Sequence, residues 1–190
     1  AGAFRYSLAA DLDMDGRLEV VAGNTAYRST GAVFWQSAAV AAGTFNAIGN
    51  FDGDPFPEVV AVGSGNIWLM EHTGAVKWGP FGIPGSTTSA TGGPPVVADV
   101  TGDGVPEIGV ATPTRYVVFT ATGAVLWQAV IRDTSSSVTS SSVFDFEGDG
   151  RAEVVYADEL FLRVFRGSDG TVLFEEPMGD ATAHENPVVA

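Results

Sequence analysis

Acidic residues recur at a fixed spacing in four short segments of this 190-residue chain. In the first segment, carboxylates stand at Asp11, Asp13, Asp15 and Glu19, which are positions 1, 3, 5 and 9 of a loop that begins at Asp11. Alternate residues of a tight loop can point to one centre, and Gly16 at position 6 permits the sharp turn. Calcium takes roughly six to eight oxygen ligands and no histidine or cysteine. The spacing therefore predicts a calcium-binding loop.

The pattern returns in three further loops, which begin at Asn50, Asp99 and Asp145. In each loop we predict ligands from positions 1, 3, 5 and 9, together with the backbone carbonyl of position 7. The predicted ligands are Asp11, Asp13, Asp15, Arg17 and Glu19 in loop one; Asn50, Asp52, Asp54, Phe56 and Glu58 in loop two; Asp99, Thr101, Asp103, Val105 and Glu107 in loop three; and Asp145, Glu147, Asp149, Arg151 and Glu153 in loop four. The chain would then bind up to four calcium ions.

The four loops are not equivalent. Loop two has Pro55 where a glycine is expected, and its first ligand is the neutral Asn50. Loop three has Thr101 in place of a carboxylate at position 3. We therefore expect loops one and four to bind calcium most tightly. An EF-hand is excluded because its closing glutamate stands at position 12, where loop one has Ala22.

The composition agrees with a cation-binding protein. The chain has 23 acidic and nine basic residues, a net charge of −14, and 14 of the acids lie in the four loops. Such a charge disfavours nucleic acids and anionic membranes as partners. No apolar stretch reaches the roughly 18 residues of a membrane span. With no cysteine, the chain has no disulfide framework, and bound metal is the alternative source of stability.

The segments between the loops are rich in valine, isoleucine and aromatic residues and are divided by glycine and proline. No helical period of apolar residues persists, so the chain is predicted to be all-β. Repeats of about 45 residues with four short antiparallel strands each are the scale of β-propeller blades. In the fourth repeat the strands are placed at 138–144, 152–157, 160–166 and 171–175. The repeats are bounded approximately as 1–40, 41–89, 90–135 and 136–182, with 183–190 beginning a fifth within one partial propeller domain.

A second signature follows each loop. Thr30-Gly31-Ala32-Val33-Phe34-Trp35 is matched at 73–78 and 122–127, and residues 169–174 are a variant in which Phe174 replaces the tryptophan. Repetition of Trp35, Trp78 and Trp127 favours core packing over sugar stacking. Trp68 stands outside this register and is a slightly better candidate for contact with a ligand, although core packing is favoured for it as well. His72 and His184 lie at no metal-binding spacing.

The four loops resemble FG-GAP repeats, also called VCBS repeats, which build the integrin α-chain propeller and many bacterial surface proteins. The resemblance implies that each loop joins the first two strands of a blade and binds calcium. The Thr-Gly-x-x-x-Trp element is similar to the docking motif of quinoprotein propellers, which implies that the tryptophan packs between blades. Because residues 186–190 repeat the pattern that precedes Asp99, we expect further blades, from the parent chain or from other subunits, to complete the ring.

The favoured function is a calcium-stabilised extracellular binding, adhesion or structural module for glycan or protein ligands. Extracellular calcium modules bind with dissociation constants of about 10⁻⁴ to 10⁻³ M, so such sites would be empty in the cytosol. The alternative is a propeller enzyme resembling rhamnogalacturonan lyases, which share acidic loops followed by Glu-Val-Val. A concave cluster of Arg5, Arg115, Arg132 and Arg163 would favour that enzyme.

Overall fold

The computed structural model describes residues 6–89, 91–179 and 187–189, and these residues form strands and connecting loops without a helix. Sixteen strands form four separate four-stranded antiparallel sheets, each built from four consecutive strands in sequence order. The all-β architecture of four four-stranded repeats is therefore confirmed. Arg5, His184 and Asn186, which carried sequence-based predictions, lie outside the described residues.

The four sheets share one layout. Sheet one contains β1 (Leu8–Ala10), β2 (Glu19–Ala22), β3 (Thr25–Tyr27) and β4 (Val33–Gln36); sheet two contains β5 (Phe45–Gly49), β6 (Glu58–Gly63), β7 (Asn66–Met70) and β8 (Val76–Gly82); sheet three contains β9 (Val96–Ala98), β10 (Glu107–Ala111), β11 (Arg115–Phe119) and β12 (Val125–Val130); sheet four contains β13 (Ser142–Phe144), β14 (Glu153–Ala157), β15 (Phe161–Phe165) and β16 (Val172–Pro177). Each acidic loop joins the first and second strands of its sheet, as the resemblance implied.

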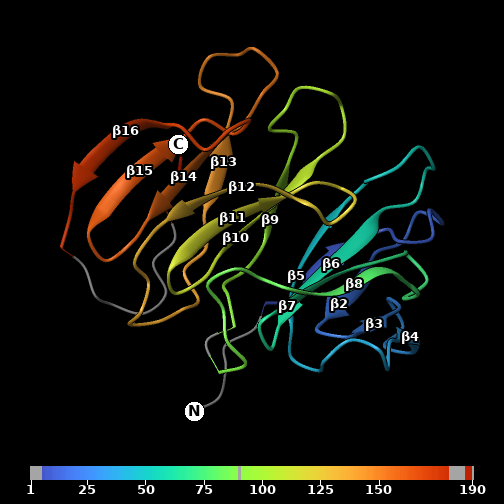
Figure 1. Ribbon diagram of the computed structural model, residues 1–190. Coiled ribbons are helices and arrows are strands. Elements are labelled where there is room, and N and C mark those ends of the chain that lie inside the picture. Colours follow the sequence, from blue (N-terminus) through green and yellow to red (C-terminus); the bar gives the residue numbers. More distant parts are fainter. Residues whose placement is uncertain (1–5, 90, 180–186, 190) are drawn as a thin grey trace.

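The sheets follow one another around a common side, with sheet one (blue) and sheet four (orange to red) at opposite ends (Figure 1). The first strands of successive sheets contact one another, so β1, β5, β9 and β13 line that inner side. Three clusters of buried residues fill the spaces between neighbouring sheets. Whereas β2 alternates between buried and exposed residues, the second strands of sheets two, three and four are buried along their whole length. This explains why β6 reads as a run of apolar residues after Glu58 rather than as an alternating pattern.

The first strand of sheet four is shorter than expected. It spans Ser142–Phe144 and not 138–144, because the preceding residues form a loop around the buried side chain of Asp133. This carboxylate accepts hydrogen bonds from the backbone N–H groups of Ser137 and Thr139 and from the Ser136 hydroxyl. These local bonds take the place of the ladder that an extended strand would form.

Each repeated tryptophan packs against the following sheet. The Nε1–H groups of Trp35, Trp78 and Trp127 donate to the carbonyls of His72, Ala121 and Gly167, at 2.7, 2.8 and 2.5 Å. All three acceptors lie in the turn between the third and fourth strands of the next sheet. The prediction of packing between blades is therefore confirmed. Trp68 is 4% exposed within the core between sheets one and two, so the favoured prediction of core packing is confirmed and a ligand contact is not.

Candidate metal loops and a second pocket

The position-9 glutamate closes every acidic loop in the same way. One oxygen, Oε2, accepts a hydrogen bond from the backbone N–H of position 2, and the glutamate is at most 5% exposed. The pairs are Leu12–Glu19 at 3.0 Å, Phe51–Glu58 at 2.7 Å, Val100–Glu107 at 3.0 Å and Phe146–Glu153 at 3.0 Å. The second oxygen of each glutamate is left free of this bond, so one side chain can fix the loop and still present a ligand atom.

The position-5 aspartate is equally regular. Its Oδ1 accepts a hydrogen bond from the backbone N–H of position 7, as in an Asx turn. The pairs are Asp15–Arg17, Asp54–Phe56, Asp103–Val105 and Asp149–Arg151, at 2.8–2.9 Å. This contact holds position 7 beside the carboxylates, as a carbonyl ligand would require. The ligand role of these carbonyls stays a prediction.

Positions 1 and 6 form a matched pair in three loops. The Oδ2 atoms of Asp11, Asp99 and Asp145 accept hydrogen bonds from the backbone N–H of a position-6 glycine with φ near +85°. A residue with a Cβ rarely adopts this conformation, so the glycine was correctly read as a requirement of the turn. In loop two, Pro55 has no N–H to donate, and Asn50 instead donates from Nδ2 to the Asp54 carbonyl at 2.7 Å. The two substitutions in loop two therefore compensate each other.

The carboxylates converge in three of the four loops. Among the described residues, triads with one oxygen each within 4.8 Å of the others are Asp11, Asp13 and Asp15; Asp52, Asp54 and Glu58; and Asp145, Glu147 and Glu153. Loop three forms no such triad, because Thr101 replaces the position-3 acid. In loops one and two, the buried atoms Asp13 Oδ1 and Glu58 Oε1 accept no hydrogen bond. Gathered carboxylates with unsatisfied oxygens fit a hard divalent cation.

Two basic side chains, which the sequence analysis missed, reach the first two loops. The Arg28 Nη1 atom lies 2.9 Å from Asp13 Oδ2 and 3.8 Å from Glu19 Oε1. The Lys77 Nζ atom lies 2.5 Å from Asp52 Oδ2 and 3.6 Å from Glu58 Oε1. The sequence did carry a signal for Lys77: it occupies the position before the repeated tryptophan, where the other repeats have apolar residues.

Lys77 changes the electrostatics of loop two. Its hydrogen bond holds the pKa of Asp52 below the ordinary value for an aspartate. Its own pKa is raised, because its contacts with Asp52, Glu71 and Glu58 outweigh the cost of burial. Loops three and four differ: within the described part of the chain, no lysine or arginine forms an ion pair with their acids.

Burial raises the pKa of the closing glutamates Glu58, Glu107 and Glu153. A hydrogen bond with Glu147 raises the pKa of Glu153 further. The pKa of Asp145 is instead lowered, first by the N–H of Gly150 and then by neighbouring backbone donors. Loops two, three and four therefore each combine an acid whose pKa is lowered, Asp52, Asp99 or Asp145, with a buried glutamate whose pKa is raised and that a bound cation would have to keep ionised.

A pocket of about 190 Å³ adjoins loop four, and Glu147, Asp149 and Glu153 line it together with Arg151 and Arg166. Arg166 pairs with Asp169 at 3.2 Å and not with the loop. The Arg151 side chain leads towards loop three, where an added Cβ at Gly102 would lie 2.9 Å from its Cγ. The acids of loop four thus face a solvent-accessible space, which gives an ion access from outside.

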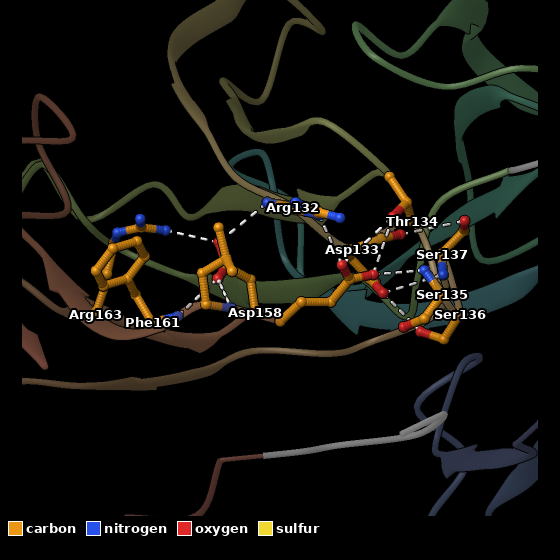
Figure 2. Close-up of polar contacts among 11 residues, drawn as sticks. Arg132, Asp133, Thr134, Ser135, Ser136, Ser137, Asp158, Phe161 and Arg163 are labelled. Carbon is orange, nitrogen blue, oxygen red and sulfur yellow. Dashed lines mark hydrogen bonds and ion pairs between the residues drawn. The ribbon is translucent and has the colours of Figure 1, made fainter. Parts of the chain in front are cut away.

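A second pocket, of about 500 Å³, lies at the other end of the strands between sheets three and four. Pro113, Val130, Ile131 and Leu160 supply apolar walls, and Arg132, Thr134, Asp158 and Arg163 add polar groups. Figure 2 shows the network that supports it: Asp158 Oδ2 accepts from the Arg132 backbone N–H at 3.0 Å and from Arg163 Nη1 at 2.7 Å.

The arginines of this pocket are neutralised by acids. Arg163 pairs with Asp158 and Glu175, both at 2.7 Å, and Arg132 pairs with Glu159 at 2.9 Å. Of the four arginines predicted to cluster in a lyase, Arg132 and Arg163 therefore share a pocket but present no net positive charge. Arg115 is not among the residues that line it.

One protein-family model matches part of the chain. Residues 50–110 match the model of the FG-GAP-like repeat. This segment, about a third of the chain, is similar to an FG-GAP-like repeat. The matched segment runs from loop two through sheet two to loop three and β10, so it contains two of the four acidic loops. A comparison with curated protein sequences found no match.

Solved structures show the same fold. The biofilm matrix protein Bap1 of V. cholerae matches with a TM-score of 0.76 and 18% identity, over 97% of this chain and 57% of that one. The rhamnogalacturonan lyase YesW matches with a TM-score of 0.59 and 20% identity, over 94% of this chain and 28% of the lyase. An Agrocybe aegerita lectin that recognises terminal N-acetylglucosamine matches with a TM-score of 0.56 and 17% identity, over 90% of this chain and 51% of the lectin.

These likenesses show a propeller-like fold and no activity, because the identities are low. The chain spans little more than half of Bap1 and less of the lyase. A search of the described residues found no helix that could serve as a membrane span.

Proposed function

We propose that the chain is a calcium-stabilised, extracellular β-propeller module that binds glycan or protein ligands. The observation that carries the proposal is the shared construction of the acidic loops. In all four, one buried glutamate fixes the loop through a backbone N–H, and in three of them the carboxylates converge within bonding reach of one ion. Asp11, Asp13 and Asp15, or their counterparts, would supply hard oxygen ligands to that ion.

Bound calcium would act by linkage. An ion that binds only the folded state stabilises it by RT ln(1 + [Ca]/Kd), which is about 1.4 kcal/mol per site at tenfold excess over Kd. Three or four sites would contribute about 4–6 kcal/mol, which is comparable with the net stability of a domain, about 5–15 kcal/mol. Calcium would also neutralise part of the −14 charge. Because extracellular calcium is millimolar and cytosolic calcium is not, we place the protein outside the cell.

The ligand of the module is proposed to be a glycan or another extracellular protein. The pocket between sheets three and four has apolar walls with hydroxyl and guanidinium donors at its edge, a combination that small-ligand sites use. The likeness to a matrix protein and to a lectin agrees with this class of function. We do not propose lyase activity, because Arg163 and Arg132 are paired with acids and cannot balance an acidic substrate.

Chelation tests the calcium role. The melting temperature is measured in EDTA, in 5 mM calcium and in 5 mM magnesium, and isothermal titration gives the stoichiometry. We expect three or four ions per chain and a melting temperature at least 10 °C higher in calcium than in EDTA, with little effect of magnesium. An unchanged melting temperature in calcium would contradict the proposal.

A glycan array with and without calcium tests the ligand class. A pocket variant, Thr114→Arg, narrows the space between sheets three and four and is expected to abolish binding, whereas Thr87→Arg, an exposed substitution away from the pocket, is expected to retain it. Binding that survives Thr114→Arg would exclude this pocket as the ligand site.

A further inference from the structure

A backbone hydrogen bond joins loops three and four. The N–H of Ala152, position 8 of loop four, donates to the carbonyl of Asp99, position 1 of loop three, at 3.0 Å. Loops two and three have proline at position 8, Pro57 and Pro106, so neither can donate such a bond to the loop before it. The link is therefore a property of this pair of loops and not of the repeat.

The Arg151 side chain makes a second contact between the same two loops. It extends from position 7 of loop four across Gly102, position 4 of loop three, where an added Cβ would lie 2.9 Å from its Cγ and 3.0 Å from its Nε. At Gly53 and Gly148, the glycines at position 4 of loops two and four, an added Cβ would meet no more distant part of the described chain within 4 Å. Arg151 thus covers the backbone of loop three, although its own backbone belongs to loop four.

Gly167 fills the space between the two loops. A Cβ added at this glycine would lie 2.6 Å from the Cβ of Val100, position 2 of loop three, and would overlap the Ala152 carbonyl. Val100 is buried, and its N–H donates to Glu107, the closing glutamate of loop three, at 3.0 Å. Ala152 directly precedes Glu153, the closing glutamate of loop four. A tightly packed segment therefore connects the two closing glutamates.

Loop three lacks the convergent acids of its neighbours. Thr101 stands where the other loops have a position-3 acid, and among the described residues its carboxylates form no triad. Its first half is organised on Asp99, whose Oδ1 accepts from the Gly102 N–H at 2.6 Å and whose Oδ2 accepts from the Gly104 N–H at 2.7 Å. Because Ala152 binds the carbonyl of the same aspartate, loop four holds the residue on which loop three depends.

We propose that calcium binding in loop four raises the affinity of loop three for calcium. This inference rests on the proposed function, since it requires both loops to bind the ion. An ion held by the predicted ligands Asp149, Arg151 and Glu153 would restrict the segment that contacts Asp99 and Gly102. Loop three then loses less conformational entropy when its own ion binds, which is positive coupling without a change of shape. The coupling is reciprocal, so an ion in loop three favours loop four equally.

Electrostatic repulsion acts in the opposite direction. An ion in loop four makes the potential at Asp99 and Asp103 less negative, which disfavours a second cation there. Salt screens this repulsion beyond about 8 Å at 0.15 M ionic strength, whereas it leaves the packed contacts of Ala152 and Arg151 unchanged. At that ionic strength we expect the contacts to dominate, with a coupling of about fivefold, at the lower end of typical values.

Proton–nitrogen NMR of the whole chain in 0.15 M salt measures the two loops separately. The N–H groups of Gly104 and Gly150, at position 6, donate to the position-1 aspartates of loops three and four at 2.7 and 2.8 Å, so their chemical shifts report calcium in each loop. Glu147→Ala removes an exposed acid from loop four. We expect this substitution to raise the calcium midpoint of Gly150 directly and that of Gly104 by about fivefold through the coupling.

Ala152→Pro distinguishes the contact from the change in charge. Proline occupies this position in loops two and three, so the loop backbone accommodates it, but the N–H that binds Asp99 is lost. In the Ala152→Pro background, Glu147→Ala should leave the Gly104 midpoint unchanged. An effect of the lost charge alone would persist in that background.

Two further variants complete the test. Arg151→Ala keeps the carbonyl of position 7 but uncovers Gly102, and it should reduce the fivefold effect of Glu147→Ala to about twofold. The matched control is Asp52→Ala, which removes the position-3 acid of loop two, on the other side of loop three. It should leave the Gly104 midpoint unchanged, because Pro106 has no N–H to bond with loop two.

The outcomes separate the coupling from the calcium role. A Gly104 midpoint that Glu147→Ala leaves unchanged would overturn the coupling, as would a shift of equal size in the Ala152→Pro background. In both cases calcium still shifts Gly150, so the calcium role stands. If calcium moves neither glycine signal, the calcium role itself fails and the coupling fails with it.

Discussion

Loops two and four share the backbone contacts of positions 5 and 9, but of the two only loop two has a basic side chain among its acids in the described part of the chain. In loop two, Lys77 lies among Asp52, Glu58 and Glu71, at 2.5 to 3.6 Å. In loop four, Asp145, Glu147 and Glu153 converge without a basic partner among the described residues. The difference teaches that the chain itself can balance a convergent set of carboxylates, and that loop four would need an ion from solvent for the same purpose. We expect the loops to depend on calcium accordingly.

The largest effect is expected from removal of the closing glutamate of loop two. Glu58→Ala leaves the buried N–H of Phe51 without its acceptor and deprives Lys77 of a buried partner. We expect a loss of about 2–3 kcal/mol in the free energy of unfolding in EDTA, and a somewhat larger loss in calcium, measured by urea denaturation. Glu71→Ala, which removes a more exposed partner of Lys77, is the control and should cost less than about 1 kcal/mol. A small loss for Glu58→Ala would show that the loop is not closed by this contact.

Replacement of Lys77 should leave the acids of loop two without a basic partner, as in loop four. Lys77→Met keeps an apolar stem but leaves the acids of loop two without a cation. We therefore expect a lower free energy of unfolding in EDTA. We also expect loop two to bind calcium about tenfold more tightly, which adds about 1.4 kcal/mol of stabilisation by calcium. Calorimetric titration measures that affinity. Arg132→Met, at the other end of the strands, should change neither quantity. Unchanged calcium binding in Lys77→Met would remove the contrast between the loops.

In loop four, a milder substitution should distinguish the effect of a bound ion from the effect of the hydrogen bond that closes the loop. Glu153→Gln keeps an oxygen acceptor for the Phe146 N–H but removes the negative charge. We expect little change in EDTA and a loss of about 1.4 kcal/mol of calcium stabilisation at tenfold excess over Kd. Glu58→Gln should lose less calcium stabilisation than Glu153→Gln, because Lys77 already balances the negative charge of loop two. Equal losses in the two variants would mean that Lys77 does not substitute for calcium.

The smallest effect is a pH dependence. The pKa values of Glu58, Glu107 and Glu153 are raised above the ordinary 4.5, so the folded state binds their protons more tightly than the unfolded state does. In EDTA, stability should therefore fall as the pH rises from about 4.5 through the raised values. Calcium favours the ionised form and should abolish or reverse this fall, which melting curves between pH 4.5 and 7 would reveal. A fall of the same size in calcium would argue against these glutamates as ligands.

Much of the molecule could be predicted from the sequence because its determinants are local. The positions of Asp11 and Gly16 predicted the turn, and the repeated Thr-Gly-x-x-x-Trp signature indicated the junctions between sheets. Lys77 was missed because its partner Asp52 is 25 residues away, and only the pairing of β7 with β8 beside loop two brings them together. The length of β13 was misjudged because the bonds of Asp133 compete with strand formation in a way that apolar patterning does not show.

The sequence by itself determined the four loops, the all-β class and the repeat of one junction, since each follows from residues within a few positions of one another. Only the tertiary structure decided which loops contain a basic side chain and which apolar face stays uncovered. Both depend on what a neighbouring strand or sheet brings close. Phe146 and Leu12 occupy the same position in sequence, yet one is exposed and the other buried, because burial is a property of the neighbour and not of the residue.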